Sequence, residues 1–328
     1  MHPSRYLLLA SVVFAATAAA PALGETVVRF AHMNSPQHFV DIEGRAMAAR
    51  IAERTGGEVQ IEMFPSGQLG ETSQIVEQIT YGGDMMSQVG PGSIADYVPD
   101  FSVIVYPFMY PDYAAAQRLL VSDLVQELEA QARDVNVQVL CYIHFGIRDL
   151  YTIATPVRSP ADSAGLKMRV QPVTLYTEMV RQVFDAEPTP MPWPDVYTAL
   201  SQGVIDAAEA PPSAIIDQRH HESARYLVQT NHILDISPIV MSASAYDGLS
   251  AEHQAIVDEE SQAGCDAMSA ASIASYEQGI ETLREAGMEI ISDVDREAFA
   301  ERAGGIAASF PEWSDGLYER ARAIVLEQ

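Results

Sequence analysis

Two arginines are candidates for binding a negatively charged ligand, because each lies in or directly after an apolar segment. Arg148 follows the apolar run VQVLCYIHF, and Arg169 lies within LKMRV. In an extended LKMRV the side chains alternate, so that of Arg169 points away from its apolar neighbours. A buried arginine usually pairs with a carboxylate or phosphate, and its planar fork can hold a carboxylate by two hydrogen bonds. The partner could be a ligand or an internal acid such as Asp149 or Glu209, and the residues alone leave both readings open.

Two further residues could line a site beside these arginines. Trp193 lies between two prolines in PTPMPWPDVY, which fix an extended backbone. Its indole could form the wall of a pocket, or it could be a core or hinge residue. Glu209 ends the predicted strand GVIDAAEA before a double proline. Its carboxylate could orient a hydroxyl or a cationic nitrogen of a ligand, or it could neutralise one of the arginines.

The sequence lacks the motifs typical of common enzyme and metal sites. GxSxG, HExxH, CxxC and the phosphate-binding glycine loops are absent, and GPGSI at Gly90 is better explained as a turn. His220 and His221 would point about 100° apart on a helix, which predicts a solvated helix face instead of a metal site. We therefore predict no cofactor and no metal. In the alternative enzyme hypothesis, a secreted hydrolase or lyase would use Glu209 and a histidine such as His38 as acid and base.

Residues 1–24 have the composition of a secretory signal peptide. Arg5 precedes an apolar run from Tyr6 to Ala20, and ALG provides small residues for cleavage before Glu25. This run is shorter than the roughly 20 apolar residues that a membrane-spanning helix needs, and no later stretch is long and apolar enough. We therefore predict an exported protein with no direct membrane insertion once the signal is cleaved.

The charge of the chain excludes two classes of partner. A formal net charge of −26 repels nucleic acid and anionic lipid, so we predict that neither is bound.

Export would permit a disulfide between Cys141 and Cys265. Because the two cysteines are isolated and far apart in the sequence, we predict separate buried thiols.

The order of the predicted elements indicates two α/β units. Alternating strands and helices in the first unit imply parallel pairing with right-handed crossovers, and the alternation begins again at Leu166. Two such units predict a ligand in the cleft between them, beyond the carboxyl ends of the strands. The expected segments are strand 26–33, helix 37–54, strand 58–64, helix 71–81, strand 84–90, helical residues 112–133, strands 137–145 and 149–155, strand 166–170, helix 172–184, extended residues 187–193, helix 194–202 and strand 203–210.

The longest predicted helix runs from 250 to 286. Ser250 is a good N-cap, and apolar residues such as Ile280 and Leu283 recur at helical spacing. At ~1.5 Å per residue this helix would reach on the order of 54 Å, which is longer than one domain. We therefore predict an α/β fold of two domains with a central cleft and a long helix that spans both. The predicted domains are 25–147 with part of 230–290, and 148–229 with the C-terminal helices, part of 290–328.

Five segments in this order resemble the solute-binding proteins of tripartite ATP-independent periplasmic (TRAP) transporters, the DctP-like family. They are PSGQLGE, GLKMRV, PTPMPWPDVYTAL, GVIDAAE and TNHIL, and the resemblance covers essentially the whole mature chain. It implies a periplasmic protein of two α/β domains that closes over one small organic anion. It also implies delivery of that anion to TRAP membrane permease subunits driven by a sodium gradient. A sensor of the same fold, which presents its ligand to a receptor, is the alternative.

The resemblance also implies roles for individual residues. The family's carboxylate-binding arginine matches Arg169, and a second cation often used against the same ligand matches Arg148. The asparagine after the first strand matches Asn34, and an aromatic position that lines the pocket matches Trp193.

One segment departs from the family pattern. Many relatives have Gln-Glu-Asn-Pro where this chain has Ala-Glu-Ala-Pro, and Ala210 cannot supply the asparagine amide that helps to hold the carboxylate. A wider cleft in which Glu209 is available to a hydroxyl or an ammonium favours a polyhydroxylated acid or a zwitterion over a simple dicarboxylate. Glu209, Ala210 and His38 complete the predicted set of ligand-binding residues.

Overall fold

One mixed sheet runs through the molecule, and the computed structural model describes residues 25–327. The predicted signal peptide, 1–24, lies outside the described residues. Within residues 25–327 the sheet has nine strands. These are β1 (Thr26–Ala31), β2 (Val59–Phe64), β3 (Met85–Gln88), β4 (Val137–Thr152), β5 (Lys167–Val170), β6 (Glu187–Pro190), β7 (Ala207–Ala210), β8 (Tyr226–Ser242) and β9 (Glu289–Ile291). Their order is β2-β1-β3-β8-β4-β7-β5-β6, and β9 pairs with β8.

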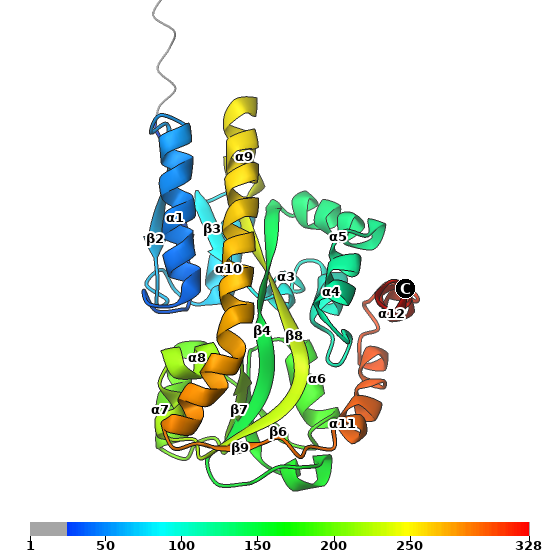
Figure 1. Cartoon of the computed structure of the whole chain (residues 1–328). Coiled ribbons are helices and arrows are strands. Elements are labelled where there is room, and N and C mark those ends of the chain that lie inside the picture. Colours follow the sequence, from blue (N-terminus) through cyan, green and yellow to red (C-terminus); the bar gives the residue numbers. More distant parts are fainter. Residues whose placement is uncertain (1–24, 328) are drawn as a thin grey trace, which may run out of the picture.

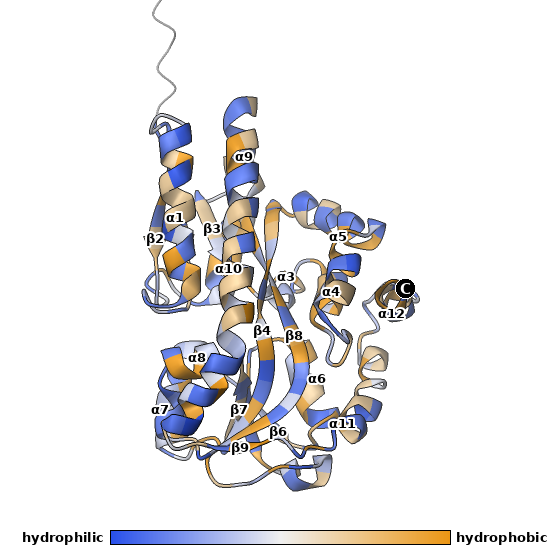
Figure 2. Ribbon diagram, in the orientation of Figure 1, coloured by the Kyte–Doolittle hydropathy of each residue, from blue (hydrophilic) through white to orange (hydrophobic). Residues whose placement is uncertain are grey.

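Helices cover this sheet, and hydrophilic and hydrophobic positions alternate along helices such as α1 and α5 (Figure 2). This pattern is expected where one face of a helix packs on the sheet and the other faces water. The α-helices are α1 (Phe39–Arg54), α2 (Thr72–Thr80), α3 (Pro91–Ile94), α4 (Tyr113–Leu120), α5 (Asp123–Asp134), α6 (Thr174–Gln182), α7 (Val196–Ser201), α8 (Pro212–Asp217), α9 (Ala243–Asp247), α10 (Ala251–Glu285), α11 (Arg296–Ala303) and α12 (Leu317–Leu326). The 3₁₀ turns are η1 (Pro99–Val105), η2 (Pro160–Ser163), η3 (Trp193–Asp195), η4 (His220–Glu222) and η5 (Ile306–Ser309).

Two groups of parallel strands form the two ends of the sheet. β1 pairs in parallel with β2 and β3, which confirms the order predicted for residues 26–90. β5 pairs in parallel with β6 and β7. The long strands β4 and β8 lie between these groups and pair antiparallel with each other (Figure 1). Residues 112–133, predicted as helical, form the two helices α4 and α5.

The prediction of two strands between residues 137 and 155 was wrong, because β4 is continuous through Gly146 and Arg148. The pairing of β4 with β8 is irregular between His144 and Gly146, and β4 continues beyond this glycine. Gly146 has φ of 146°, and a Cβ there would lie 2.8 Å from the side chain of Pro211. Only glycine fits this conformation and this close approach. The predicted domain division after residue 147 therefore falls inside a strand, and that division remains a prediction.

The predicted long helix is confirmed as α10. Its N-cap is Ser250, whose hydroxyl accepts a hydrogen bond from the backbone N–H of His253 at 3.1 Å. α10 runs along β4, with α1 beside its first half and α8 beside its second (Figure 1). Apolar side chains from its first part, such as Met268, join one buried cluster, and Leu283 joins another. Within residues 25–327 no helix is both long and apolar enough to cross a membrane.

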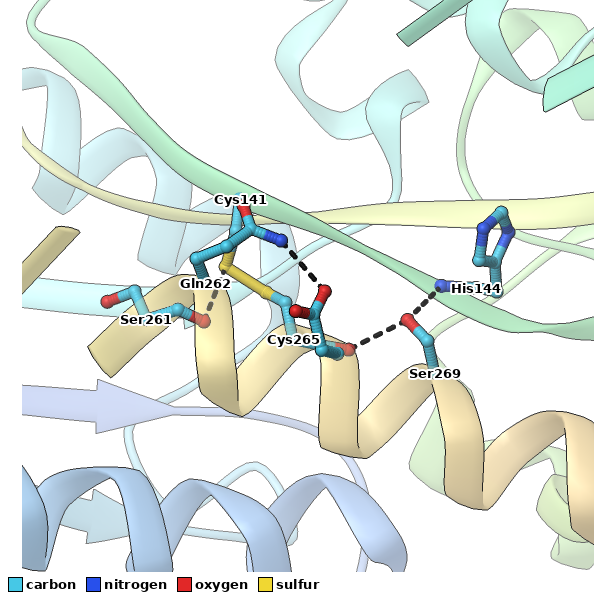
Figure 3. Close-up of a disulfide and its surroundings, with 7 residues drawn as sticks. Cys141, His144, Ser261, Gln262, Cys265 and Ser269 are labelled. Atoms are coloured by element: carbon cyan, nitrogen blue, oxygen red, sulfur yellow. Dashed lines mark hydrogen bonds between the residues drawn. A yellow bond between two sulfur atoms is a disulfide. The ribbon is translucent and has the colours of Figure 1, made fainter. Parts of the chain in front are cut away.

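The prediction of two separate thiols was wrong, because Cys141 of β4 and Cys265 of α10 form a disulfide (Figure 3). Their Cα atoms lie 6.3 Å apart, and the bond joins positions 124 residues apart in the sequence. Ser269 continues the connection one turn along α10. Its hydroxyl accepts a hydrogen bond from the backbone N–H of His144 at 3.0 Å and donates one to the carbonyl of Cys265 at 2.7 Å. The long helix is thus covalently fixed to the central strand.

A second connection lies where β4, β8 and α10 meet. The buried carboxyl group of Asp149 accepts hydrogen bonds from the backbone N–H of Asn231 at 2.9 Å and from the hydroxyl of Tyr276 at 2.9 Å. Burial raises the pKa of Asp149 to about 7, although these hydrogen bonds and the charge of Arg296 act in the opposite direction. The acid is therefore held in a site that favours its neutral form.

Removing the disulfide should destabilise the fold. We expect the double variant Cys141→Ser/Cys265→Ser to lose about 2–5 kcal/mol of unfolding free energy, because the bond restricts a long loop of the unfolded chain. Urea denaturation of the variant and of the oxidised protein measures this. Ser269→Ala is the matched control, since it removes only the adjacent hydrogen bonds and should cost about 1 kcal/mol. Equal midpoints for the double variant and the parent would contradict the expectation.

The raised pKa of Asp149 predicts a pH-dependent stability. A carboxyl whose pKa is higher in the folded protein than the ordinary 3.8 stabilises folding increasingly as pH falls from about 7 to about 4. Asp149→Asn should therefore be more stable than the parent at pH 8, by up to a few kcal/mol, and similar to it near pH 4. Urea midpoints measured from pH 4 to 8 test this. A difference between the two proteins that does not change with pH would count against it.

Candidate ligand-binding site

A cavity of about 110 Å³ lies at the centre of the sheet, where the two groups of parallel strands face each other. Asn34 and Gln88 reach it from the carboxyl ends of β1 and β3, and Arg169 and Ala210 from β5 and β7. This placement is the usual one for ligands of open α/β sheets. This volume is several times the roughly 10–15 Å³ that one water molecule needs, so the cavity has room for a small organic molecule.

Arg169 is buried in the wall of this cavity with much of its hydrogen-bonding capacity unused. It is 2% exposed, and its Nε and Nη2 atoms donate to the backbone carbonyl of Met191 at 3.1 and 2.9 Å. Nη1 is buried without a partner, and within residues 25–327 no acid forms an ion pair with this guanidinium. Burial lowers the pKa of Arg169 to about 10, although the charge of Glu209 acts in the opposite direction, so the group stays protonated at pH 7.

Trp193 supports the guanidinium from one side. The central carbon of the Arg169 guanidinium lies 5.0 Å from the centroid of the indole, a distance suited to a cation–π interaction. Trp193 also lines the cavity, which agrees with the reading that placed it in a pocket wall. Trp193 is the first residue of η3, which begins shortly after the end of β6 and so places the indole near that strand.

The prediction that His220 lies on a solvated helix face was wrong, because its side chain is fully buried behind Trp193. The two rings meet edge to face with centroids 4.7 Å apart, and Nδ1 of His220 lies 2.8 Å from the hydroxyl of Tyr151. Burial and then the charge of Arg169 lower the pKa of His220 to about 3. A neutral imidazole thus positions the indole that contacts the arginine.

Arg148 lines the same cavity but is paired with internal acids. Its Nε and Nη2 donate to the carboxylate of Glu209, and its Nη1 donates to Oδ2 of Asp235 at 2.6 Å. Nη2 also donates to the backbone carbonyl of Glu209 at 3.0 Å. Burial opposes the charge of this arginine, but the two acids raise the pKa of Arg148 well above its usual value. Of the two readings for Arg148, the structure shows the internal ion pair, formed with Glu209 and not with Asp149.

Four of the five N–H groups of Arg148 are engaged, whereas Arg169 keeps both N–H groups of Nη1 and one of Nη2. A planar carboxylate needs two adjacent N–H groups for bidentate binding. Arg169 can therefore bind an incoming carboxylate by its fork, and Arg148 can offer it at most one hydrogen bond.

Neither Glu209 nor His38 is among the described residues that line the cavity. Glu209 is fully buried, and Nε2 of His232 lies 3.4 Å from its carboxylate. Burial raises its pKa, but Arg148 and His232 outweigh this and hold the pKa of Glu209 at about 2. His38 instead caps α1 and packs against Phe39 and Phe145. The acid and base of the enzyme hypothesis are therefore not brought together, and each has other structural contacts.

Asn34 and Ala210 both line the cavity. Nδ2 of Asn34 donates to Oε1 of Gln88 at 3.2 Å, which couples the two amides at the ends of neighbouring strands. Asp235 also lines the cavity but was not among the predicted site residues. Its signal in the sequence is the one used for the arginines, an ionisable residue inside the apolar segment HILDISPIV. Within residues 25–327 no group of three or more His, Cys, Asp or Glu side chains is placed to hold a metal ion.

The two ends of the sheet also touch each other outside the cavity. The backbone N–H of Ser35, in the loop after β1, donates to Asp217 of α8 at 3.1 Å, and the hydroxyl of Ser35 contacts the same carboxylate. A Cβ on Gly92 of α3 would lie 2.5 Å from the side chain of Val173, which precedes α6. Glycine is thus required for the two ends to approach this closely.

Comparison with known proteins places this geometry in a family. Residues 30–311 match the DctP model, described as bacterial extracellular solute-binding protein, family 7. Over 279 residues, 84% of each chain, the protein is 31% identical to the 2,3-diketo-L-gulonate-binding periplasmic protein YiaO of Escherichia coli K12.

Solved structures of TRAP periplasmic solute-binding proteins have the same fold. That from Actinobacillus succinogenes 130Z with bound L-galactonate has a TM-score of 0.87 at 29% identity, covering 92% of this chain and 99% of that one. That from Fusobacterium nucleatum with bound sn-glycerol-3-phosphate has a TM-score of 0.88 at 28% identity, covering 91% and 96%. The predicted α/β fold of a two-domain binding protein is confirmed. The chain belongs to family 7 of the bacterial extracellular solute-binding proteins, the DctP family of TRAP transporter binding proteins.

Proposed function

We propose that this protein is the periplasmic binding component of a TRAP transporter and that Arg169 binds the carboxylate of a small organic anion in the central cavity. Family membership supports the binding role. The single observation that carries the assignment of Arg169 is its buried guanidinium, which has free N–H groups and no acid as a partner among residues 25–327. A buried cation without a counter-ion is costly, and a carboxylate ligand would remove that cost.

The other residues of the cavity have separate roles in this proposal. Trp193 positions the guanidinium and excludes water from it, and Arg148, whose charge is matched by Glu209 and Asp235, offers at most one direct hydrogen bond. Asn34 and Gln88 offer amide groups to the polar part of the ligand, while Ala210 leaves space for it. Glu209 acts through Arg148, and His38 supports the loop after β1; neither contacts the ligand directly.

The names of similar proteins support an acid of this size. YiaO is described as binding 2,3-diketo-L-gulonate, and the structure from A. succinogenes contains L-galactonate. Both are six-carbon monocarboxylates with several oxygen substituents. The cavity of about 110 Å³, lined by one free arginine and several neutral polar groups, is compatible with such a molecule.

We further propose that the ligand draws the two ends of the sheet together and is released unchanged to membrane permease subunits. The contacts of Ser35 with Asp217 and of Gly92 with Val173 support closure around the cavity, with residues 25–147 and 148–229 as the main parts of the two domains. Binding without chemical conversion agrees with the family and with the separation of Glu209 from His38. Recovery of the intact anion after incubation with the protein tests this last point.

Changing Arg169 should abolish binding without unfolding the protein. Arg169→Lys keeps the charge but not the planar fork, so we expect at least a hundredfold loss of affinity for L-galactonate, since two charge-assisted hydrogen bonds contribute about 1.5–3 kcal/mol each. Isothermal titration calorimetry measures the affinity. In thermal unfolding, L-galactonate should raise the melting temperature of the parent and leave that of the variant unchanged. Normal binding by the variant would refute the assignment of the carboxylate site.

The two arginines should differ in their effect on the empty protein. Arg148→Met leaves Glu209 and Asp235 buried without their counter-ion, which should cost about 3–5 kcal/mol of unfolding free energy at pH 7. Arg169→Met removes a cation that has no ion-pair partner, so stability should be unchanged or slightly higher. Urea denaturation without ligand compares the two variants. Equal destabilisation by both would mean that Arg169 has a structural role like that of Arg148.

A further inference from the structure

The charged groups of the cavity wall are unevenly matched. Arg169 is a cation without an internal acid, whereas Arg148 is shared between two acids, Glu209 and Asp235. Burial raises the pKa of Asp235, whereas the charge and the hydrogen bond of Arg148 favour its ionised form. With both acids ionised, the Arg148 group carries one negative charge more than it has positive charges. The wall therefore has a surplus positive charge on one group and a surplus negative charge on another. One acidic group of a ligand is thus matched by Arg169, and the surplus negative charge beside it opposes a second acidic group.

Asp235 is the acid that faces the cavity. It is 3% exposed, and it projects from the middle of β8 into the cavity lining, beside Arg148. Its Oδ2 accepts the hydrogen bond from Arg148 at 2.6 Å. Its Oδ1 accepts only a long contact of 3.4 Å from the hydroxyl of Ser237. Because each carboxylate oxygen can accept about two hydrogen bonds, Oδ1 keeps unused acceptor capacity in a buried place.

The neutral polar groups of the lining indicate what kind of donor fits beside Asp235. Asn34, Gln88 and Gln171 bring amides, and Ser237 brings a hydroxyl. Amides both donate and accept hydrogen bonds, and so do the hydroxyls of a ligand, whereas an ammonium only donates. A ligand with several hydroxyls can donate to Asp235 and can both donate to and accept from the amides, whereas an ammonium can only donate.

We infer that Asp235 determines the ligand class: it accepts a hydrogen bond from a hydroxyl of the ligand and excludes a second acidic group, so that the site takes polyhydroxylated monocarboxylates and rejects dicarboxylates. This inference rests on the proposed function, because it takes the carboxylate of the ligand to be bound by Arg169. The exclusion has a simple electrostatic cause. A second carboxylate would be buried near Asp235 with no unpaired cation among the described lining residues to compensate it.

Two probes with the same carbon skeleton test the inference. L-galactonate has one carboxylate, and galactarate has a second carboxylate in place of the terminal hydroxymethyl group. Isothermal titration calorimetry at pH 7.5 should show galactarate binding at least a hundredfold more weakly to the parent protein. Asp235→Asn keeps the shape of the side chain and removes its charge. It should weaken L-galactonate several-fold, strengthen galactarate, and reduce the ratio of the two affinities at least tenfold.

Control variants separate this inference from the proposed function. Asp162→Asn, the same substitution at an exposed acid of η2 outside the cavity lining, should leave the ratio of affinities within about twofold of the parent. Thermal unfolding of Asp235→Asn checks that Arg148, which loses one charged partner, still holds the fold. Equal binding of both probes by the parent, or an unchanged ratio in Asp235→Asn, would overturn the role of Asp235 while leaving the proposed function intact. Binding that does not depend on Arg169 would overturn both.

Discussion

The site depends on a guanidinium group that is buried without a counter-ion in the part of the chain that the structure describes. Arg169 can stay in that position because its surroundings compensate part of its charge without forming an ion pair: the carbonyl of Met191 accepts two hydrogen bonds, and the face of Trp193 lies against it. Neither interaction uses Nη1. The fold therefore keeps a strong, oriented donor free for a ligand, in an environment where charged hydrogen bonds are stronger than in water.

The support of this donor extends through several layers of the structure. Trp193 is placed by the strand β6 and held at its edge by His220, which in turn contacts the hydroxyl of Tyr151 on β4. In the wall of the same cavity, the guanidinium of Arg148 is held by ion pairs with Glu209 and Asp235. The two arginines of this cavity thus differ in their surroundings, since Arg148 is engaged by two acids and Arg169 keeps N–H groups without a partner.

Sequence reasoning succeeded where neighbouring residues decide the outcome. The alternation in LKMRV placed Arg169 on the face opposite its apolar neighbours. In the structure Arg169 lines the cavity while Met168 and Val170 join a buried apolar cluster, and the predicted N-cap Ser250 marks the start of α10. It failed where distant residues decide. The acids that engage Arg148 come from 61 and 87 positions away, and the burial of His220 depends on Tyr151 and Trp193 from other elements. The wrong prediction of a break in β4 has a local cause. A glycine within a strand can mark a bend, but in the sequence it looks the same as a glycine that ends a strand.

The continuity of β4 and β8 through both ends of the sheet has a mechanical consequence. Since no loop is interposed in these two strands, one end can move relative to the other only by bending or twisting of paired backbone. The pairing is irregular around Gly146 and between Arg148 and Leu150, and such irregularities bend a strand and increase its local twist. Arg148 and Asp235 lie in the same stretch, so the distorted part of the two-stranded ribbon and the wall of the cavity are built from the same residues.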